Sequence, residues 1–374
     1  MRKGWEYKKL GEVATFINGD RGKNYPSAKD FVESGVPFIN AGHLNNGIIS
    51  YDKMNYITIN KYNSLGSGKI IKNDILFCLR GSLGKYAIVA EDSMGAIASS
   101  LVIIRPFQNA DNRFIAHFLS SAKIKEYIAK NNNGSSQPNL SAKSVASFII
   151  PLPTLSTQLA IVSELDKINE LIRLKKEQLK DFDNLAQSLF YEMFGDPVEN
   201  EKGWEVKKLG EICEIFAGGD KPKDMCEIQN NEYIYPVIAN GEGEKGILGY
   251  TKNCRVTKEA VTIGARGASI GNCRIVKNGF TPAIRLLTLI PTGSIDCCFL
   301  YYFVKDLNYK QNGAGQAQLT VPNIKCEFIP LPPLSLQRLF AQRIEQIERE
   351  KSEVQKSIQD LETLLASRMQ YWFE

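Results

Sequence analysis

Two long stretches of the chain place hydrophobic residues at alternating spacings of four and three positions. They span residues 158–194 and 337–373. Their apolar positions correspond at a fixed distance, since Phe340 follows Ile161 by 179 residues and Leu361 follows Phe182 by the same 179 residues. An apolar spacing of this kind, kept for about five heptads, is typical of a coiled-coil seam rather than of an ordinary amphipathic helix. The pattern predicts two long helices in one register that pack against each other.

Each predicted helix contributes seven residues to this seam. They are Ile161, Leu165, Ile168, Ile172, Leu179, Phe182 and Leu189 in the first helix, and Phe340, Ile344, Ile347, Val354, Ile358, Leu361 and Leu365 in the second. Lys175, Lys351 and Arg368 occupy slots that the pattern would otherwise fill with apolar residues. The first helix leads into the second globular region and the second helix leads out of it. If the helices pack together, they are therefore antiparallel, with the globular regions at opposite ends.

The repeat extends beyond the helices. The segment GWEYKKLGE at 4–12 returns as GWEVKKLGE at 203–211, GSSQPNLS at 134–141 returns as GAGQAQLT at 313–320, and IPLP at 150–153 returns at 329–332. Self-similarity on this scale indicates a tandem duplication. We expect a globular domain at 1–153, a long helix at 154–195, a second globular domain at 196–332 and a second long helix at 333–374.

Within each globular region the pattern predicts short strands followed by one helix. Runs of β-branched and aromatic residues bounded by Gly, Asn and Asp indicate strands at 36–40, 74–79, 86–89 and 100–104, and at 233–238, 260–264, 273–276 and 285–290. Helical periodicity predicts helices at 112–130 and 299–307. Ser156 is a plausible N-cap of the first long helix, and Gly195 followed by Pro197 would end it. The fold class is α+β with a pseudo-two-fold internal repeat.

Composition excludes several classes of protein. No apolar run is long enough to span a membrane, and residues 1–6 have no apolar signal-peptide region, so we expect a cytoplasmic protein. The eight cysteines form no C-x-x-C pair and the chain has only two histidines, which favours buried thiols in a reducing compartment over a metal site. The net charge of +5 permits a polyanionic partner without identifying one.

The sequence argues against an enzyme. The segment LGSGKI at 65–70 resembles a phosphate-binding P-loop, but Asn63 and Ile70 stand where that motif requires Gly and Ser or Thr. No nucleophile elbow, zinc-protease motif or aminomethyltransferase tetrad is present, and two histidines leave little scope for acid–base catalysis. We therefore expect no catalytic residues, no metal and no cofactor bound by this chain.

Basic, glycine-rich loops are the best candidates for binding. Each half has one soon after its start and one after a strand, and together they supply Arg21, Lys23, Asn24, Arg80, Ser82 and Lys85 in the first half and Lys221, Lys223, Arg266 and Ser269 in the second. Such side chains contact phosphates and read base edges, while glycine lets the backbone approach a partner closely. The alternative, that any single loop is only a solvated turn, carries equal weight. Gln137 and Gln316, in the repeated polar loops, are better explained as structural.

These duplicated motifs resemble those of the specificity subunit of type I restriction–modification systems. The resemblance rests on the Gly-Trp-x-x-Lys-Lys-Leu-Gly-Glu opening, the Gly-x-x-Gln-x-x-Leu segment and the Ile-Pro-Leu-Pro-x-Leu-Ser-x-Gln lead into a long helix, and it covers essentially the whole chain. It implies two target-recognition domains, each reading one half of a split, asymmetric sequence in double-stranded DNA. The paired helices would set the unread gap between the halves.

The resemblance also implies partners. Two modification subunits would methylate adenine with S-adenosylmethionine, and ATP-dependent restriction subunits using Mg²⁺ would join them, while this chain makes no bonds in DNA. Leu171, Leu174 and Leu185 lie off the seam and would form part of the docking surface, or else flank a broad seam. The alternatives are the specificity part of a system whose methylation and cleavage sit in one fused partner, a structural coiled-coil protein that binds protein or glycan, and an unfamiliar enzyme.

Overall fold

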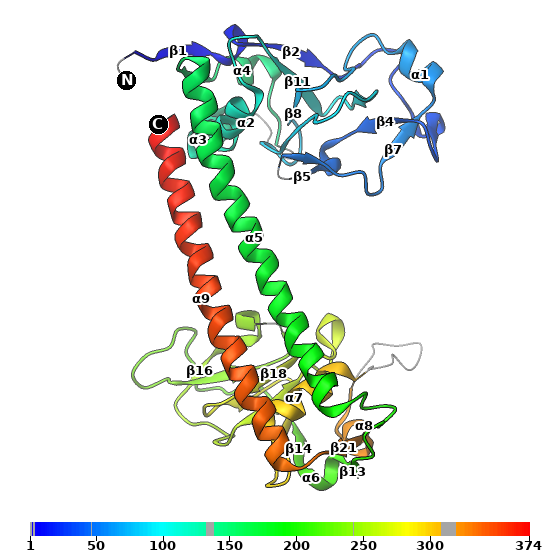
Figure 1. The fold of residues 1–374 in the computed structure, drawn as a ribbon, viewed down its shortest axis with the longest axis vertical. Coiled ribbons are helices and arrows are strands. Elements are labelled where there is room, and N and C mark those ends of the chain that lie inside the picture. Colours follow the sequence, from blue (N-terminus) through cyan, green and yellow to red (C-terminus); the bar gives the residue numbers. More distant parts are fainter. Residues whose placement is uncertain (1, 3, 46, 132–137, 242, 308–318) are drawn as a thin grey trace. The chain divides into compact units, whose positions relative to one another are not determined.

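The computed structural model describes residues 2, 4–45, 47–131, 138–241, 243–307 and 319–374. The chain forms two compact units (Figure 1). Unit 1 comprises Met1–Lys176 with Ser357–Glu374, and unit 2 comprises Glu177–Lys356. Each unit therefore contains one end of both long helices.

A four-stranded antiparallel sheet with the same strand order forms the centre of each unit. In unit 1 the order is β2 (Ala14–Asn18), β11 (Leu101–Pro106), β8 (Ile75–Cys78) and β9 (Tyr86–Ile88). In unit 2 it is β14 (Cys213–Ala217), β20 (Leu287–Pro291), β17 (Ala260–Ile263) and β18 (Cys273–Val276). The predicted strands at 74–79, 86–89, 100–104, 260–264, 273–276 and 285–290 belong to these two sheets.

Smaller sheets and short helices surround each central sheet. Unit 1 has β10 (Ala96–Ile97), β4 (Val36–Ile39), β7 (Asn55–Ile57) and β3 (Phe31–Val32) in one sheet, the hairpin β5 (Leu44–Asn45) and β6 (Ile48–Ile49), and the helices α1 (Ile59–Ser64) and α4 (Ala142–Ala146). Unit 2 has β16 (Ile247–Thr251), β15 (Tyr235–Ile238) and β19 (Thr281–Pro282), and the helices α6 (Leu209–Ile212) and α8 (Val321–Cys326).

The repeated sequence motifs pair with one another. β1 (Glu6–Lys9), from the opening motif, is antiparallel to β12 (Ile149–Leu152), from the Ile-Pro-Leu-Pro motif. β13 (Glu205–Lys208) and β21 (Phe328–Leu331) repeat this pairing in unit 2. Each motif pair is thus a two-stranded clasp that joins the start of a unit to the start of a long helix. The pairing of these two motifs was missed from the sequence.

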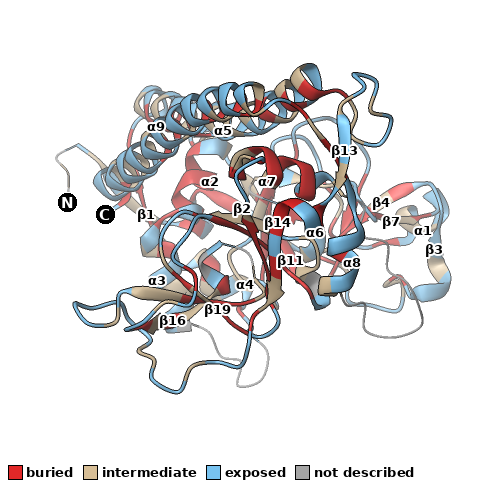
Figure 2. Ribbon diagram, turned by 90° about the horizontal axis from the view of Figure 1, so that it is seen from below, coloured by how far each residue is buried: buried red, intermediate tan, exposed pale blue. Residues whose placement is uncertain are grey.

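One amphipathic helix packs on the central sheet in each unit. These are α2 (Asn112–Ser120) and α7 (Cys297–Asp306), both of which are mostly buried (Figure 2). The prediction of one helix over 112–130 was wrong, because α2 ends at Ser120 and a second helix, α3 (Ala122–Asn131), follows. Ser121 is extended between them, and its hydroxyl accepts a hydrogen bond from the Ile124 N–H. Serine side chains compete with helical hydrogen bonds in this way.

The two long helices are α5 (Leu155–Phe194) and α9 (Leu334–Phe373), each of 40 residues. The N-cap of α5 is Thr154 rather than Ser156, since the Thr154 hydroxyl accepts from the Thr157 N–H. Gly195 follows the helix with a φ of 79°, a left-handed conformation that suits glycine at a helix C-terminus. No helix among the described residues has both the length and the apolar character to cross a membrane.

The helices run antiparallel within each unit. In unit 1, Lys176 pairs with Glu362, and Glu164, earlier in α5, pairs with Arg368, later in α9. In unit 2 the Lys351 ammonium lies 2.8 Å from the Asp183 carboxylate. All fourteen predicted seam residues are buried or half-buried. The predicted α+β class with two long helices is confirmed.

The far ends of the helices dock into the units in equivalent ways. In unit 1 the ring of Phe373 lies 5.3 Å from that of Phe114 on α2. In unit 2 the ring of Phe194 lies 4.7 Å from that of Phe299 on α7. Because Phe194 and Phe373 are separated by the same 179 residues as the seam positions, the repeat includes this docking contact.

Candidate nucleic-acid interface

Three loops meet at one end of the central sheet in unit 1. β2 and β8 end there, and β9 and β11 begin there, since Asn18 is paired with Val102 and Cys78 with Leu101. We call this the loop end of the sheet. The loop after β2, the turn between β8 and β9 and the turn before β11 therefore converge, although they are far apart in the sequence.

The loop after β2 contains Arg21, Lys23 and Asn24. The Arg21 and Lys23 side chains are exposed, and a guanidinium nitrogen of Arg21 donates to the Ser99 carbonyl at 3.4 Å. Asn24 has a structural role, because its amide donates to the Ser64 carbonyl at 2.7 Å. Asp20 fixes the loop by accepting from the N–H groups of Gly22 and Gly66, which lower the pKa of its carboxyl group.

The turn between β8 and β9 presents Arg80, Ser82 and Lys85, all with exposed side chains. The backbone closes the turn, because the Cys78 N–H donates to the Lys85 carbonyl at 2.8 Å. Gly84 has a φ of 82°, which suits glycine at this position. The fixed turn leaves the three side chains at the loop end.

Unit 2 builds the same arrangement with different side chains. Lys221 and Lys223 follow β14 and are exposed, and Arg266 lies exposed in the turn between β17 and β18. Ser269 in that turn is half-buried. All ten predicted binding residues thus lie in loops at the loop end of their own sheet.

A third loop at the loop end was missed from the sequence. It comprises residues 98–101 in unit 1 and 283–286 in unit 2, immediately before β11 and β20. The Leu101 N–H donates to the Ala98 carbonyl at 3.0 Å, and the Leu286 N–H donates to the Ala283 carbonyl at 3.1 Å. The strands predicted at 100–104 and 285–290 included part of each turn, so neither turn was recognised.

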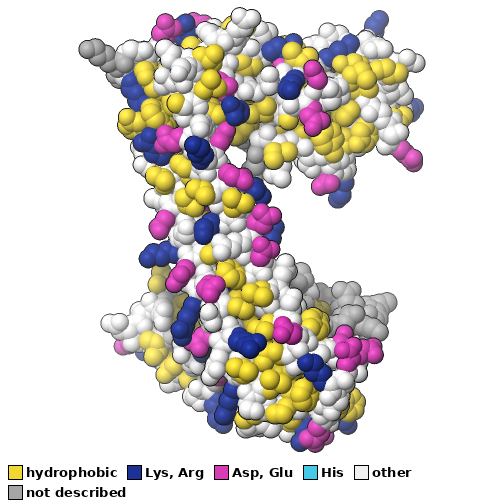
Figure 3. Space-filling model, in the orientation of Figure 1, with side chains coloured by type: hydrophobic (Ala, Val, Ile, Leu, Met, Phe, Trp, Pro, Cys, Tyr) yellow, Lys and Arg dark blue, Asp and Glu magenta, His cyan; other side chains and the backbone are white. Residues whose placement is uncertain are grey.

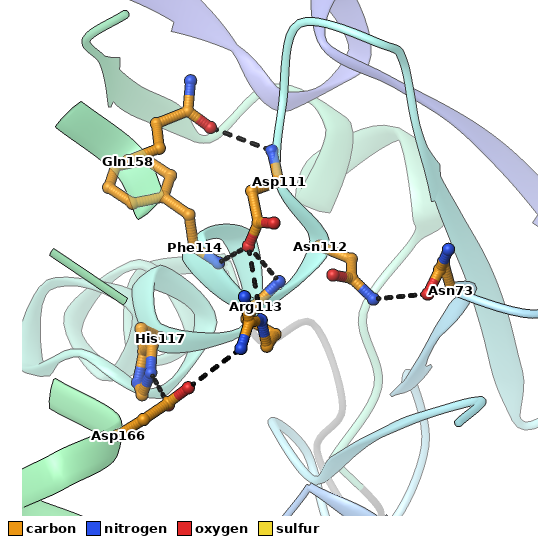
Figure 4. Close-up of polar contacts among 8 residues, drawn as sticks. All are labelled: Asn73, Asp111, Asn112, Arg113, Phe114, His117, Gln158 and Asp166. Carbon is orange, nitrogen blue, oxygen red and sulfur yellow. Dashed lines mark hydrogen bonds and ion pairs between the residues drawn. The ribbon is translucent and has the colours of Figure 1, made fainter. Parts of the chain in front are cut away.

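Two buried glutamines attach the long helices to the units, and these were also missed. Gln158 accepts from the Asp111 N–H at 2.9 Å (Figure 4) and donates to the Asn109 and Pro153 carbonyls. Gln337 accepts from the Asp296 N–H at 2.8 Å and donates to the Ser294 and Pro332 carbonyls. The signal was the repeated Gln that closes the Pro-Leu-Pro motif. Gln137 and Gln316, the glutamines noted instead, lie outside the described residues.

A second polar cluster joins α2 to α5 in unit 1 (Figure 4). A ring nitrogen of His117 lies 2.7 Å from the Asp166 carboxylate, and a guanidinium nitrogen of Arg113 lies 3.4 Å from it. The equivalent positions in unit 2 are Tyr302 and Glu345, so the pair is not repeated. It holds the two helices together in one unit only.

Figure 3 shows charged side chains of both signs, with hydrophobic side chains among them, on the visible face of the long helices. Leu185 in unit 2 and Leu364 in unit 1 are 52% and 46% exposed, and they occupy equivalent positions of the repeat. Leu171 and Leu174 are also exposed. Their exposure agrees with a surface outside the seam.

Most of the cysteines are buried or half-buried thiols. The described residues contain no group of three or more His, Cys, Asp or Glu side chains that could hold a metal ion. Burial raises the pKa of the Cys213 thiol to about 12 and, with the neighbouring Asp296 carboxylate, that of Cys298 to about 12. These thiols are protonated near neutral pH and are poor nucleophiles.

Comparisons with known proteins agree on one family. Residues 2–181 and 201–363 match the model of the type I restriction modification DNA specificity domain. A type I specificity subunit of Mycoplasma pneumoniae is 31% identical over 233 residues, which are 61% of this chain and 62% of that protein. The MjaIX specificity subunit of Methanocaldococcus jannaschii is 24% identical over 378 residues, 90% of this chain and 85% of that protein.

Solved structures share the fold. The S subunit of a type I system from M. genitalium aligns over 99% of this chain and 96% of its own, with a TM-score of 0.59 and 16% identity. A structure from work on assembly and conformational transition of the type I system aligns over 99% of this chain and 97% of its own, with a TM-score of 0.65 and 22% identity.

Proposed function

The chain belongs to the type I restriction–modification DNA specificity family, and from this premise we propose that its two units read the two halves of a split DNA sequence. The observation that carries the proposal is the convergence of the loops. In each unit, basic and polar side chains from separate segments meet at the loop end of the same four-stranded sheet. Arg and Lys side chains in such loops supply phosphate contacts and base readout.

The two half-sites should differ in sequence. The frame of each unit is repeated, including the two-stranded clasp and the buried glutamine. The loops are not repeated, since the strand register aligns Arg21 with Asp220 and Lys85 with Asn272. A common frame that carries different loops supports two recognition surfaces of different specificity.

The long helices would act as the spacer and as the docking site for two modification subunits. Leu364 and Leu185 support this role, because each unit exposes a leucine at the same position of the repeat. Exposed apolar side chains of this kind mark protein contacts when they form patches. S-adenosylmethionine, ATP and Mg²⁺ would be bound by the modification and restriction subunits. This chain would position the DNA and catalyse nothing itself.

The test is a map of methylated adenines. The chain is expressed with its modification subunit in a host that lacks adenine methylation, and modified bases are located by single-molecule sequencing. We expect one split motif that is absent when this chain is omitted. A soluble complex that produces no new methylation would contradict the proposal.

Salt dependence separates this function from protein or glycan binding. A DNA-binding unit that neutralises several phosphates should lose affinity steeply with salt, with a logarithmic slope of about −0.9 per phosphate contacted. The measurement uses the full chain with its modification subunits and a duplex that carries the mapped motif. A flat salt dependence would favour the structural coiled-coil alternative.

A further inference from the structure

The turn before β20 in unit 2 has an unusual backbone. Its two central residues, Ile284 and Arg285, have φ values of 49° and 60°. Among the described non-glycine residues, they are the only neighbours that both have positive φ. Two positive φ values at the centre of a turn define the type I′ geometry, which strongly favours Asn-Gly. A β-branched residue such as isoleucine is especially unfavourable there.

The fold holds this turn in place from both sides. Ala283 and Leu286 are buried, and the Ile284 N–H donates to the Gly219 carbonyl at 2.8 Å. The Arg285 N–H donates to the Gly218 carbonyl at 3.1 Å. The side-chain amide of Asn240 donates to the Ile284 carbonyl at 2.7 Å. The backbone is therefore satisfied, while both central side chains remain exposed.

The close approach of this turn to the loop after β14 depends on glycine. A Cβ atom at Gly218 would lie 2.7 Å from the Ala283 nitrogen, so any larger residue would push the turn away. Because of this approach, Ile284 and Arg285 lie against Gly218 and Gly219, the residues that begin the basic loop containing Lys221 and Lys223. The turn is thus part of the loop end, not a separate surface.

Unit 1 makes the same connection without positive φ values. Ser99 and Ser100 occupy the equivalent positions between Ala98 and Leu101, and neither has a positive φ. The strained pair is therefore not required to make this connection. Local backbone strain that the fold does not require points to a role for the side chains it displays.

We propose that Ile284 and Arg285 form the base-reading tip of unit 2, with the Arg285 guanidinium recognising a guanine edge. The inference rests on the proposed function and adds the residue that gives unit 2 its specificity. Arginine presents two parallel N–H donors that match guanine O6 and N7, which is the commonest specific contact to a base. The neighbouring Ile284, 45% exposed, supplies an apolar contact beside it.

The test replaces the pair by the residues that the turn prefers, Ile284→Asn with Arg285→Gly, in the full chain with its modification subunits. We expect the melting temperature to rise, because Asn-Gly relieves the strain. We expect affinity for a duplex carrying the mapped motif to fall roughly five- to 150-fold, the range for loss of one bidentate base contact. Unchanged affinity and an unchanged second half-site would overturn the proposal.

Two single variants separate a base contact from a phosphate contact. Arg285→Lys keeps the charge but lacks the planar pair of donors, so it should relax the choice of one guanine in the second half-site. If Arg285→Lys keeps that choice, the side chain does not read a base. Lys258→Ala is the control for the loss of one positive charge and should leave the motif intact. Lys258 is exposed and lies just before β17, at the opposite end of the sheet from the loop end.

The first half-site is an internal reference. It should be unchanged in every variant, because unit 1 is not altered. If the wild-type chain directs no split methylation, the proposed function fails and this inference falls with it. If the wild type gives a split motif and the variants also give it unchanged, only this inference fails.

Discussion

The two central sheets have the same strand order but differ on one face. The face that packs on the helix is apolar in both units, with Phe77 in unit 1 and Ile263 in unit 2 at equivalent positions. On the opposite face, the neighbouring pair Leu76 and Ile103 in unit 1 is replaced by a threonine pair in unit 2. The side that supports the frame is kept, whereas the other side has diverged.

The opposite face is also covered differently. In unit 1 the hairpin of β5 and β6 contributes Leu44 and Ile49 to an apolar cluster with Ala87. In unit 2 the position of Ala87 is taken by Arg274, whose guanidinium donates to the Gly243 carbonyl at 2.7 Å. Burial lowers the pKa of Arg274. Duplication thus preserved the helix side of each unit and left the other side free to change.

The largest change in stability is expected when a buried leucine in the sheet of unit 1 is replaced by the threonine found at the equivalent position of unit 2. Leu76→Thr should lower the free energy of unfolding by about 3–4 kcal/mol, because it removes buried apolar volume and places an unpaired hydroxyl in an apolar cluster. Urea unfolding can be followed by Trp5 and Trp372 fluorescence in a Trp204→Phe background, which reports on unit 1. Ile48→Thr, at an exposed position of β6, is the control and should have little effect.

The buried glutamine that joins a long helix to its unit occurs in both units, and we expect its loss to lower the stability of either one. Gln337→Ala leaves the Asp296 N–H and two carbonyls without their partner, and should cost about 2–3 kcal/mol. Trp204 fluorescence in a Trp5→Phe/Trp372→Phe background reports on unit 2. The exposed Gln342→Ala on the same helix is the matched control. Equal stability of the two variants would show that the buried glutamine does not hold the helix to the unit.

The reverse change in unit 2 should be stabilising. Thr288 is fully buried, and its hydroxyl has no hydrogen-bond partner within the described part of the chain. Thr288→Val removes the unpaired hydroxyl while keeping the shape, so we expect a gain of about 1 kcal/mol. The exposed Thr257→Val should give no comparable gain. A loss of stability in Thr288→Val would indicate that the hydroxyl is paired.

The smallest effect concerns an ion pair present in unit 1. Hydrogen bonds from Arg368 and Trp372 lower the pKa of Glu164 below its usual 4.5. The equivalent residues in unit 2 are Arg343 and Leu189, which cannot form this pair. Because the folded pKa is lowered, the stabilisation is present above pH 4.5 and is lost as pH falls through the folded pKa.

The direction of this pH dependence is checked by measuring the free energy of unfolding of wild type and of Glu164→Gln at several pH values. Wild type should be slightly more stable at pH 7, and the difference should shrink as the pH falls below 4.5. Both side chains are about one third exposed, so the effect is that of a partly screened pair. A difference that grows on acidification would contradict the assignment.

Periodicity and repetition predicted most of the frame, because these signals extend over many residues. The long helices followed from the four-three apolar spacing, their common register from the 179-residue offset, and their antiparallel direction from the order of helices and globular regions along the chain. The break at Ser121 was missed because a serine that caps a helix and one that lies inside it look alike in sequence. The clasp was missed because the prolines of the Ile-Pro-Leu-Pro motif argue against a central strand. In the structure this motif forms one strand of a two-stranded sheet, in which Pro151 lies opposite Tyr7.

The sequence identified individual loops of the candidate site but not their convergence at one end of the sheet. Gly, Arg and Lys marked the loops that contain Arg80 and Arg266, but only strand order brings them beside the loops after β2 and β14. The turn with Ile284 and Arg285 has no turn-forming residue at its centre. Sequence propensity therefore predicted strand at the position where the fold imposes a strained turn.

We propose that the two units read half-sites separated by a coiled-coil spacer. The most direct test inserts one heptad into each long helix, at Gln178 in α5 and Gln355 in α9, and maps methylated adenines in complex with the modification subunits. One heptad adds about 10 Å at about 1.5 Å per residue, or roughly three base pairs. We expect a longer gap between two unchanged half-sites. Altered half-sites, or an unchanged gap in a methylating complex, would contradict it.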